Sequence, residues 1–108
     1  MGASKVYIVV RTDISLGDQV TQAVHGAQQF QDKHPRIYAE WKKTSNTVAI
    51  LGAPNEAHLN QLQSMAESYS IPHAIFREPD IGDSLTVLVL APHPISKRLT
   101  SSLSLLLP

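Results

Sequence analysis

The chain has 108 residues, a length suited to one compact domain, and 43% of them are hydrophobic, which is enough to build a core. Nine Lys and Arg balance nine Asp and Glu, which argues against a dedicated nucleic-acid-binding protein, because such proteins usually carry a basic excess. The absence of cysteine excludes disulfides and thiolate metal sites.

The first apolar segment, residues 5–11, is short and rich in β-branched side chains. Its continuous apolarity predicts a strand that is buried on both faces. The segment is too short for a signal or membrane segment, so we expect a soluble, cytoplasmic protein that contacts no membrane. A polar loop follows over residues 12–17, and Ser15 or Asp18 can cap the next helix.

The first helix has two neighbouring faces of different character. Apolar side chains at 3.6-residue spacing predict its core face, which consists of Val20, Ala23, Val24, Ala27 and Phe30. The stripe beside it is polar and consists of Asp18, Gln22, His25 and Gln29. Imidazole titrates near neutrality, so His25 can shuttle protons or donate to an anion; an ordinary histidine on a helix flank is the more common alternative.

Helices and strands alternate along the rest of the chain. Pro35 can start a short second helix in which Trp41 faces inward together with Ile37 or Tyr38. Residues 46–54 predict a strand, and residues 55–70 predict a helix whose apolar face consists of Leu59, Leu62, Met65, Ala66 and Tyr69. Strands over 73–78 and 85–92 precede a tail helix that presents Ile95, Leu99, Leu103 and Leu106 on one face.

This order of elements predicts an α/β fold. We expect residues 1–108 to form a single-domain sandwich, in which a four-stranded mixed sheet carries helices on both faces. The sheet should be mixed because the link between the last two strands is short, which favours an antiparallel pair.

Charged residues gather where the predicted strands end: Arg11 and Asp13 follow the first strand, and Glu78 ends the third. Sites in open α/β sheets form at the carboxyl ends of strands beside helix N-termini. We therefore expect Arg11, Asp13, Gln22, His25 and Glu78 to converge in one cleft. A carboxylate beside an arginine could orient a water or a hydroxyl group. An equally good interpretation is that the pair is an ordinary surface salt bridge, which stabilises the fold by about 0–1 kcal/mol.

Several familiar motifs are absent from the sequence. No histidine pair has HxxxH or HExxH spacing, so we predict no metal site. The chain also lacks GxGxxG, GxxxxGK[ST] and GxSxG, the usual marks of nucleotide-binding folds and of the hydrolase nucleophile elbow.

The opening run VYIVVRTDISLG…QAVHGA resembles that of the type-two peptidyl-tRNA hydrolases, the archaeal and eukaryotic kind. In that family a first strand ending in Arg-x-Asp-Leu is followed by a Gly-Lys loop and by a helix with Ala-Gln-x-x-His-Ala. Arg11-Thr12-Asp13-Ile14, Gln22 and His25-Gly26-Ala27 match in order. The resemblance covers nearly the whole chain, including Trp41, PNEAHLNQLQSMAESYSIPH and LTVLVLAPHP.

The resemblance carries expectations about activity. Members of the family cleave the ester that joins a peptide to the terminal ribose of tRNA, and they are commonly homodimers of compact α/β domains. The resemblance implies that peptidyl-tRNA or tRNA is the partner. It also implies that the site residues include Arg11, Asp13, Gln22, His25 and Thr86. We expect no cofactor, because ester hydrolysis can run on a general base plus oxyanion stabilisation.

Two positions depart from the family pattern. The loop lysine of the family, held to be important for catalysis, falls on Asp18, so an anion replaces a cation. The family's Asp-Ala-Gly-x-Thr segment is replaced by the shorter run 77–81, in which Glu78 is the nearest stand-in for the aspartate. This pattern is closer to a divergent branch of hydrolase-domain proteins that also replaces the lysine.

The leading interpretation is therefore a peptidyl-tRNA hydrolase. Glu78 or Asp13 would orient or activate a water. His25 and Gln22 would hold the ester or ribose end, and Arg11 would offset the developing oxyanion. The residues expected to contact substrate also include Asp18, Thr86, Lys42 and Lys43, with Lys97 and Arg98 as further candidates for tRNA phosphates.

Two alternatives remain at this point. The chain could be a non-catalytic domain of the same fold that binds RNA or a protein, which the neutral net charge and Asp18 favour. It could also hydrolyse a different small ester or amide.

Overall fold

A computed structural model of the chain describes residues 4–107. Its elements, in chain order, are β1 (Lys5–Arg11), α1 (Leu16–Lys33), α2 (Pro35–Thr44), β2 (Thr47–Ala53), α3 (Glu56–Ser68), β3 (His73–Glu78), the 3-10 turn η1 (Pro79–Ile81), β4 (Ser84–Leu90) and α4 (Pro94–Leu99). The strands form one sheet in the order β2-β1-β4-β3. β1 runs parallel to β2 and antiparallel to β4, which is also antiparallel to β3.

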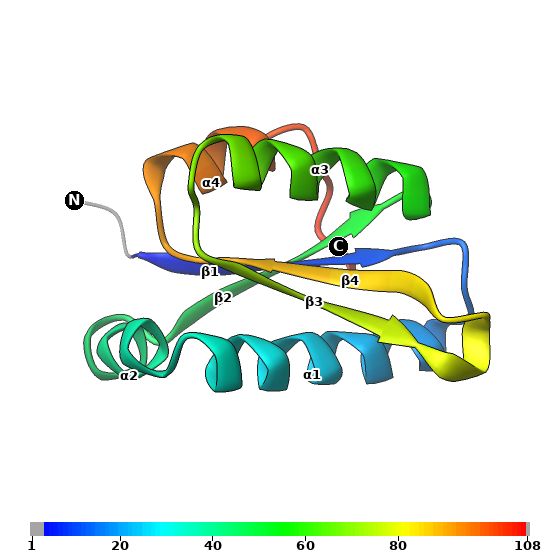
Figure 1. Cartoon of the computed structure of the whole chain (residues 1–108), viewed down its shortest axis with the longest axis horizontal. Coiled ribbons are helices and arrows are strands. Elements are labelled where there is room, and N and C mark those ends of the chain that lie inside the picture. Colours follow the sequence, from blue (N-terminus) through cyan, green and yellow to red (C-terminus); the bar gives the residue numbers. More distant parts are fainter. Residues whose placement is uncertain (1–3, 108) are drawn as a thin grey trace.

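Helices cover both faces of this sheet (Figure 1). α1 and α2 lie on one face, and α3 and α4 lie on the other. The predicted α/β sandwich with a four-stranded mixed sheet is therefore confirmed. β1 occupies a central position between β2 and β4. Its continuous apolar sequence follows from that position, because a central strand between two helical layers buries both faces.

Each face of the sheet has its own core layer. The layer beneath α1 and α2 includes Val10, Phe30 and Trp41. The indole Nε1 of Trp41 donates to the carbonyl oxygen of Thr47 at 2.9 Å, which ties α2 to the start of β2. The layer beneath α3 and α4 includes Val9, Leu59, Leu62, Leu85 and Leu88.

The buried face of α1 differs from the prediction. Val20 and Val24, predicted to be core residues, are 51% and 54% exposed, whereas Gln22 of the predicted polar stripe is 1% exposed. Gly26 explains the difference, because a Cβ there would come within 2.7 Å of Cγ2 of Val87. Glycine lets this side of α1 approach β4 closely, and the valines consequently face outward. The rest of the predicted face is buried or half-buried, at Ala23, Ala27 and Phe30.

The apolar face of α3 is narrower than predicted. Leu59, Leu62 and Ala66 are buried against the sheet, but Met65 and Tyr69 are 38% and 57% exposed. A helix that lies on one sheet face buries a single stripe along its axis, and these two side chains fall outside that stripe.

The predicted tail helix is wrong beyond Leu99, where α4 ends. The chain crosses instead to the edge of β2. There the amide of Gly52 donates to the carbonyl of Ser104 at 3.0 Å, and the amide of Leu106 donates to the carbonyl of Ile50 at 2.9 Å. The serine-rich stretch after α4 has weak helix propensity, and the open edge of β2 supplies backbone partners that a helix would not use.

Candidate functional site

A β-bulge shapes the end of the sheet at which β3 ends and β4 begins. Phe76 pairs with Val87 and Arg77 pairs with Leu85, so Thr86 is the extra residue of β4. A bulge re-aims a side chain that strict alternation would send to the other face. Thr86 is fully buried and points toward α1.

Thr86, Gln22 and Glu78 form a chain of hydrogen bonds. Oγ1 of Thr86 donates to Oε1 of Gln22 at 2.6 Å, and Nε2 of Gln22 donates to Oε1 of Glu78 at 2.8 Å. The other carboxylate oxygen, Oε2, accepts a longer bond of 3.4 Å from the amide of Asp80. Gln22 and Thr86 are 1% and 0% exposed, and Glu78 is half-buried. The chain thus runs from the core outward and holds the carboxylate at its outer end.

His25 lies one helical turn beyond Gln22 on α1, beside β3, the strand that ends at Glu78. Its ring stacks on that of Phe76, with the centroids 4.5 Å apart and an interplanar angle of 27°. Residues three apart on a helix share a side, and so do residues two apart on a strand. Gln22 and His25 therefore lie along one seam opposite Glu78 and Phe76, where α1 meets the edge strand β3.

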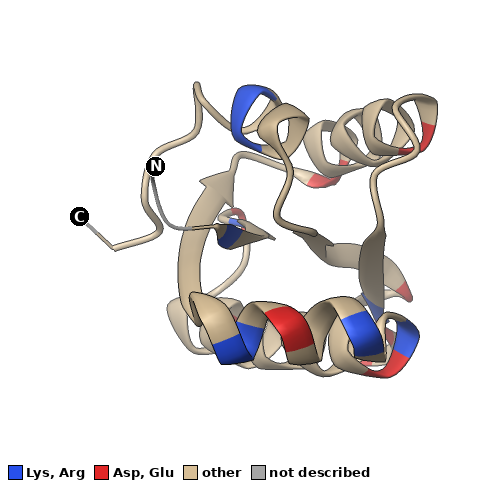
Figure 2. Ribbon diagram, turned by 90° about the vertical axis from the view of Figure 1, so that its left-hand side faces the viewer, with Lys and Arg blue, Asp and Glu red and all other residues tan. Residues whose placement is uncertain are grey.

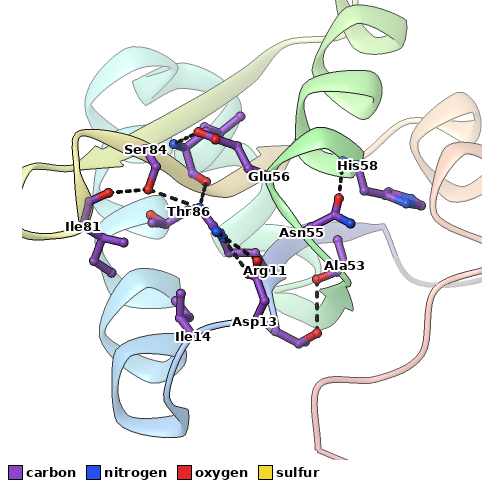
Figure 3. A network of polar contacts seen from close by, with 12 residues as sticks. Arg11, Asp13, Ile14, Ala53, Asn55, Glu56, His58, Ile81, Ser84 and Thr86 are labelled. Carbon is purple, nitrogen blue, oxygen red and sulfur yellow. Dashed lines mark hydrogen bonds and ion pairs between the residues drawn. The ribbon is translucent and has the colours of Figure 1, made fainter.

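Arg11 and Asp13 form a second network at the carboxyl end of β1 (Figure 3). Nε and Nη2 of Arg11 donate to the two carboxylate oxygens of Asp13 at 2.7 and 2.9 Å. Nη1 donates to Oγ of Ser84 at 3.1 Å and to the carbonyl of Leu85 at 3.4 Å. The hydrogen bond from Arg11 lowers the pKa of Asp13 below its ordinary value. The same bond raises the pKa of Arg11, and the charge of Glu56 adds to that effect.

The two networks meet at adjacent residues of β4. Oε2 of Glu56, in the first turn of α3, accepts from the amide of Leu85 at 2.6 Å, while Arg11 donates to the carbonyl of the same residue. The next residue, Thr86, leads to Gln22. Arg11 and Asp13 thus lie at the same end of the sheet as Glu78 but belong to a separate set of hydrogen bonds.

Side chains around the start of α1 secure the loop that precedes it. Ser15 is the N-cap, and its Oγ accepts from the amide of Asp18 at 3.1 Å. Gln19, which the sequence analysis passed over, is 9% exposed and donates to the carbonyl of Ile14 at 2.8 Å. Its position three residues before Gln22 on the same helix was the signal that could have found it. Asp18 is exposed in the first turn, where a negative charge complements the helix dipole.

Lys42 and Lys43 do not lie with these residues. They occupy the last turn of α2, directly before β2, which runs in register with β1. The candidate site is at the far end of the seven-residue strand β1, about 20 Å away along the sheet. Lys97 of α4 lies at the same distant end, because it lines a hollow together with Lys5.

Residues 4–107 lack both a cluster of metal-binding side chains and a long apolar helix. That part of the chain holds no group of three or more His, Asp or Glu side chains placed to bind a metal ion. It also contains no helix with the length and apolarity required to cross a bilayer.

The sequence matches the family described as "Peptidyl-tRNA hydrolase PTH2" over residues 4–106. The chain belongs to this family. The membership expected from the motifs around Arg11, Gln22 and His25 is therefore confirmed. The match spans both hydrogen-bond networks and both helical layers.

Three relatives of this PTH2-family chain illustrate the similarity. A peptidyl-tRNA hydrolase of Haloquadratum walsbyi (strain DSM 16790 / HBSQ001) is 34% identical over 112 residues, covering 94% of this chain and 98% of the relative. A peptidyl-tRNA hydrolase of Thermococcus onnurineus (strain NA1) is 28% identical over 100 residues, with 83% and 85% coverage. The mitochondrial peptidyl-tRNA hydrolase 2 of Mus musculus is 28% identical over 104 residues, with 87% coverage of this chain and 58% of the relative.

A solved structure shares the fold of this PTH2-family chain. It is a protein of unknown function from Agrobacterium tumefaciens strain C58, with a TM-score of 0.71 and 10% identity. The likeness covers 97% of this chain and 98% of the other. At this identity it shows the arrangement of the elements and carries no information on activity.

Proposed function

We propose that this PTH2-family chain hydrolyses the ester bond between a peptide and the terminal ribose of tRNA. Family membership over residues 4–106 and the activity named for its relatives support the proposal. The observation that carries it is the Thr86–Gln22–Glu78 chain of hydrogen bonds, which fixes a carboxylate at the molecular surface beside His25.

Glu78 is the proposed general base. Its Oε1 accepts from Gln22, and its Oε2 has a single long bond from a backbone amide, which leaves that oxygen able to accept a proton from water. The water oxygen bonds to the ester carbonyl carbon, the bond from that carbon to the ribose oxygen breaks, and the ribose oxygen takes the proton from Glu78. Glu78 suits this role better than Asp13, because both oxygens of Asp13 accept from Arg11.

The remaining roles follow from burial and contacts. His25 is half-buried and its ring stacks on Phe76, so we assign it the ester carbonyl or the ribose hydroxyls. Gln22 is a positioning residue for Glu78, because it is buried. Arg11 directs its donors at Asp13 and at β4, which supports a bracing role over direct oxyanion stabilisation. Thr86 is likewise a positioning residue.

Turnover by purified protein tests the proposal. We expect peptidyl-tRNA to be cleaved by the wild type and Glu78→Gln to lower kcat by on the order of 10²–10⁴, the usual contribution of a general base. Glu67→Gln is the matched control, because Glu67 is an exposed carboxylate at the end of α3 that is distant from the candidate site. Equal turnover by the Glu78→Gln variant and the wild type would remove Glu78 from the mechanism.

Charge favours a second candidate, a non-catalytic RNA-binding domain of the same fold. The exposed carboxylate of Asp18 stands where the resemblance places a lysine, and six of the nine acidic residues lie at the site end. Such an end repels the phosphates at the terminus of tRNA, which argues against hydrolysis there but leaves RNA free to bind another surface of the domain. Tight tRNA binding without turnover would support this second function. The six acidic residues at the site end are Asp13, Asp18, Glu56, Glu78, Asp80 and Asp83.

We also propose a homodimer that acts in the cytoplasm, where translation supplies peptidyl-tRNA. The support for a dimer is an apolar surface on which the outward-facing Val20 and Val24 line a hollow of about 470 Å³ with Ile50 and residues 105–107. Exposed apolar patches of this kind commonly mark interfaces between protein chains.

A further inference from the structure

Charged side chains are unevenly distributed between the two ends of the sheet. The end at which β1 begins faces the viewer in Figure 2, where Lys and Arg appear on α2, on α4 and at the start of β1. It holds seven of the nine basic residues and three acidic residues, Asp32, Glu40 and Glu67, whereas the other six acidic residues lie at the site end. The seven, which we call the basic end, are Lys5, Lys33, Arg36, Lys42, Lys43, Lys97 and Arg98.

A groove crosses the basic end between α2 and α4. One hollow of about 350 Å³ is lined by Arg36 and by one acidic residue, Glu40, and a second of about 330 Å³ is lined by Lys5 and Lys97. Both hollows are bordered by Ser4 and Pro92, so they adjoin, and we refer to the two together as the groove. Three different elements thus contribute a cation to the same groove.

Helix stability accounts for five cations of the basic end, which lie in the last turns of α1, α2 and α4, but not for Arg36 and Lys5. Cations in the last turn of a helix complement its dipole, but Arg36 lies in the first turn of α2, directly after Pro35, where the dipole disfavours a positive charge. Lys5 lies on a strand. Among residues 4–107, neither side chain has an ion-pair partner, because the ion pair found there joins Arg11 to Asp13.

We propose that the basic end binds the phosphodiester backbone of RNA, as a surface separate from the candidate site. The inference rests on the proposed function in one respect, namely that the RNA is the body of the tRNA whose terminal ribose carries the ester. A backbone is an extended row of anions, and the groove offers cations from three elements along its length. Because the site end is acidic, the basic end supplies the attraction for the nucleic acid and the site end contacts only its terminus.

A charge-matched pair of variants tests this inference through binding of deacylated tRNA. Arg36→Gln/Lys97→Gln removes two positive charges from the groove. Asn60→Asp/Gln61→Glu makes the same change in net charge on exposed positions of α3. We expect the groove variant to raise Kd on the order of tenfold near 0.1 M salt and to reduce the slope of log Kd against log salt by about 1.4–1.8. The α3 variant should change Kd less than twofold.

Other outcomes of the binding experiment would overturn the inference. These are no tRNA binding by the wild type, an equal loss of affinity in both variants, or unchanged binding in the groove variant. Competition by polyglutamate or by phosphatidylserine vesicles as strong as that by tRNA at equal charge would also overturn it, since either would assign the basic end to another class of partner.

Hydrolysis separates this inference from the proposed function. A peptidyl ester of adenosine reaches the candidate site but is too short to reach the basic end, about 20 Å away. We expect the groove variant to lower the ratio of kcat/KM for peptidyl-tRNA to kcat/KM for the short ester by on the order of tenfold. If the wild type cleaves neither ester, the proposed function fails, while weakened tRNA binding in the groove variant still supports the basic end as an RNA surface.

Discussion

The side-chain amide of Gln22 donates to the carboxylate of Glu78 at 2.8 Å and joins α1 to the end of β3, 56 residues further along the chain. The same amide accepts from the buried hydroxyl of Thr86. A glutamine with 1% exposure therefore places a carboxylate at the molecular surface without touching solvent itself. The position of the proposed base depends on how closely α1 lies against β4, because Gln22 must reach both strands.

Replacing Gln22 with methionine keeps the side-chain volume but removes both hydrogen bonds. We expect the free energy of unfolding to fall by about 1–3 kcal/mol, because the polar partners lose a buried bond. We expect kcat to fall while KM changes little, since the carboxylate of Glu78 is no longer held. Urea denaturation and turnover measure the two effects, and Gln28→Met on the exposed side of α1 is the control. An unchanged kcat would show that Gln22 has only a structural role.

Gly26→Ala tests the close approach of α1 to β4. The new Cβ would lie 2.7 Å from Cγ2 of Val87, so one of the two elements must shift. We expect a loss of about 1–3 kcal/mol in unfolding free energy from overpacking, even though alanine is the better helix former. Gly17→Ala is the control, because no atom lies within 4 Å of its Cβ position. Adding Val87→Ala to Gly26→Ala should recover part of the loss. If Gly26→Ala leaves the free energy of unfolding unchanged, α1 does not pack against β4 this closely.

The Arg11–Asp13 pair predicts a pH dependence of stability. Because the pKa of Asp13 is lowered from 3.8 in the folded state, its contribution is present above that value and disappears as pH falls through the folded pKa. The Asp13 side chain is 40% exposed, so the contribution is at most about 1 kcal/mol. Urea denaturation should separate the wild type from Asp13→Asn at pH 7 and bring them together as pH falls below the folded pKa of Asp13. If the difference in unfolding free energy between the two proteins grows as pH falls, the pKa of Asp13 is not lowered by folding.

Asp18→Lys should tighten the binding of tRNA. Two like charges about 4 Å apart cost about 1 kcal/mol in water, so removing the repulsion at the start of α1 should change affinity several-fold. The control, Asn60→Lys/Gln61→Lys, gains the same two units of charge on exposed positions of α3. Fluorescence anisotropy across a salt series compares the two. An equal gain in both variants would mean that Asp18 does not face the nucleic acid.

Val24→Asp tests the proposed dimer surface. Val24 is 54% exposed beside the apolar hollow, so an aspartate there should leave the fold intact and prevent association, because dimerisation would bury its charge. Light scattering should show a dimer for the wild type and for Gln29→Asp and a monomer for Val24→Asp. A monomeric wild type at high micromolar concentration would refute the dimer.

Local pattern determined much of the fold and part of the site. The apolar runs around Val9 and Leu88 marked two strands, because strand periodicity depends on neighbouring residues. Ser15 or Asp18 marked the start of α1 for the same reason, and the structure shows that Ser15 is the N-cap. The grouping of Arg11 with Asp13 at the end of β1 was also foreseeable, since the two are only two positions apart in the sequence. Motif order sufficed to indicate the family, which the match over residues 4–106 confirms.

Only the tertiary structure decided how these elements meet. The contact of Gly26 with Val87 turned Val20 and Val24 outward, and the bulge at Thr86 sent its hydroxyl to Gln22. The tail paired with β2 instead of continuing α4, and the direction of the strands put the basic residues at the end opposite Glu78. These outcomes depend on packing and backbone pairing between segments far apart in the chain, and local periodicity contains no information about which distant partner a face or an edge will find.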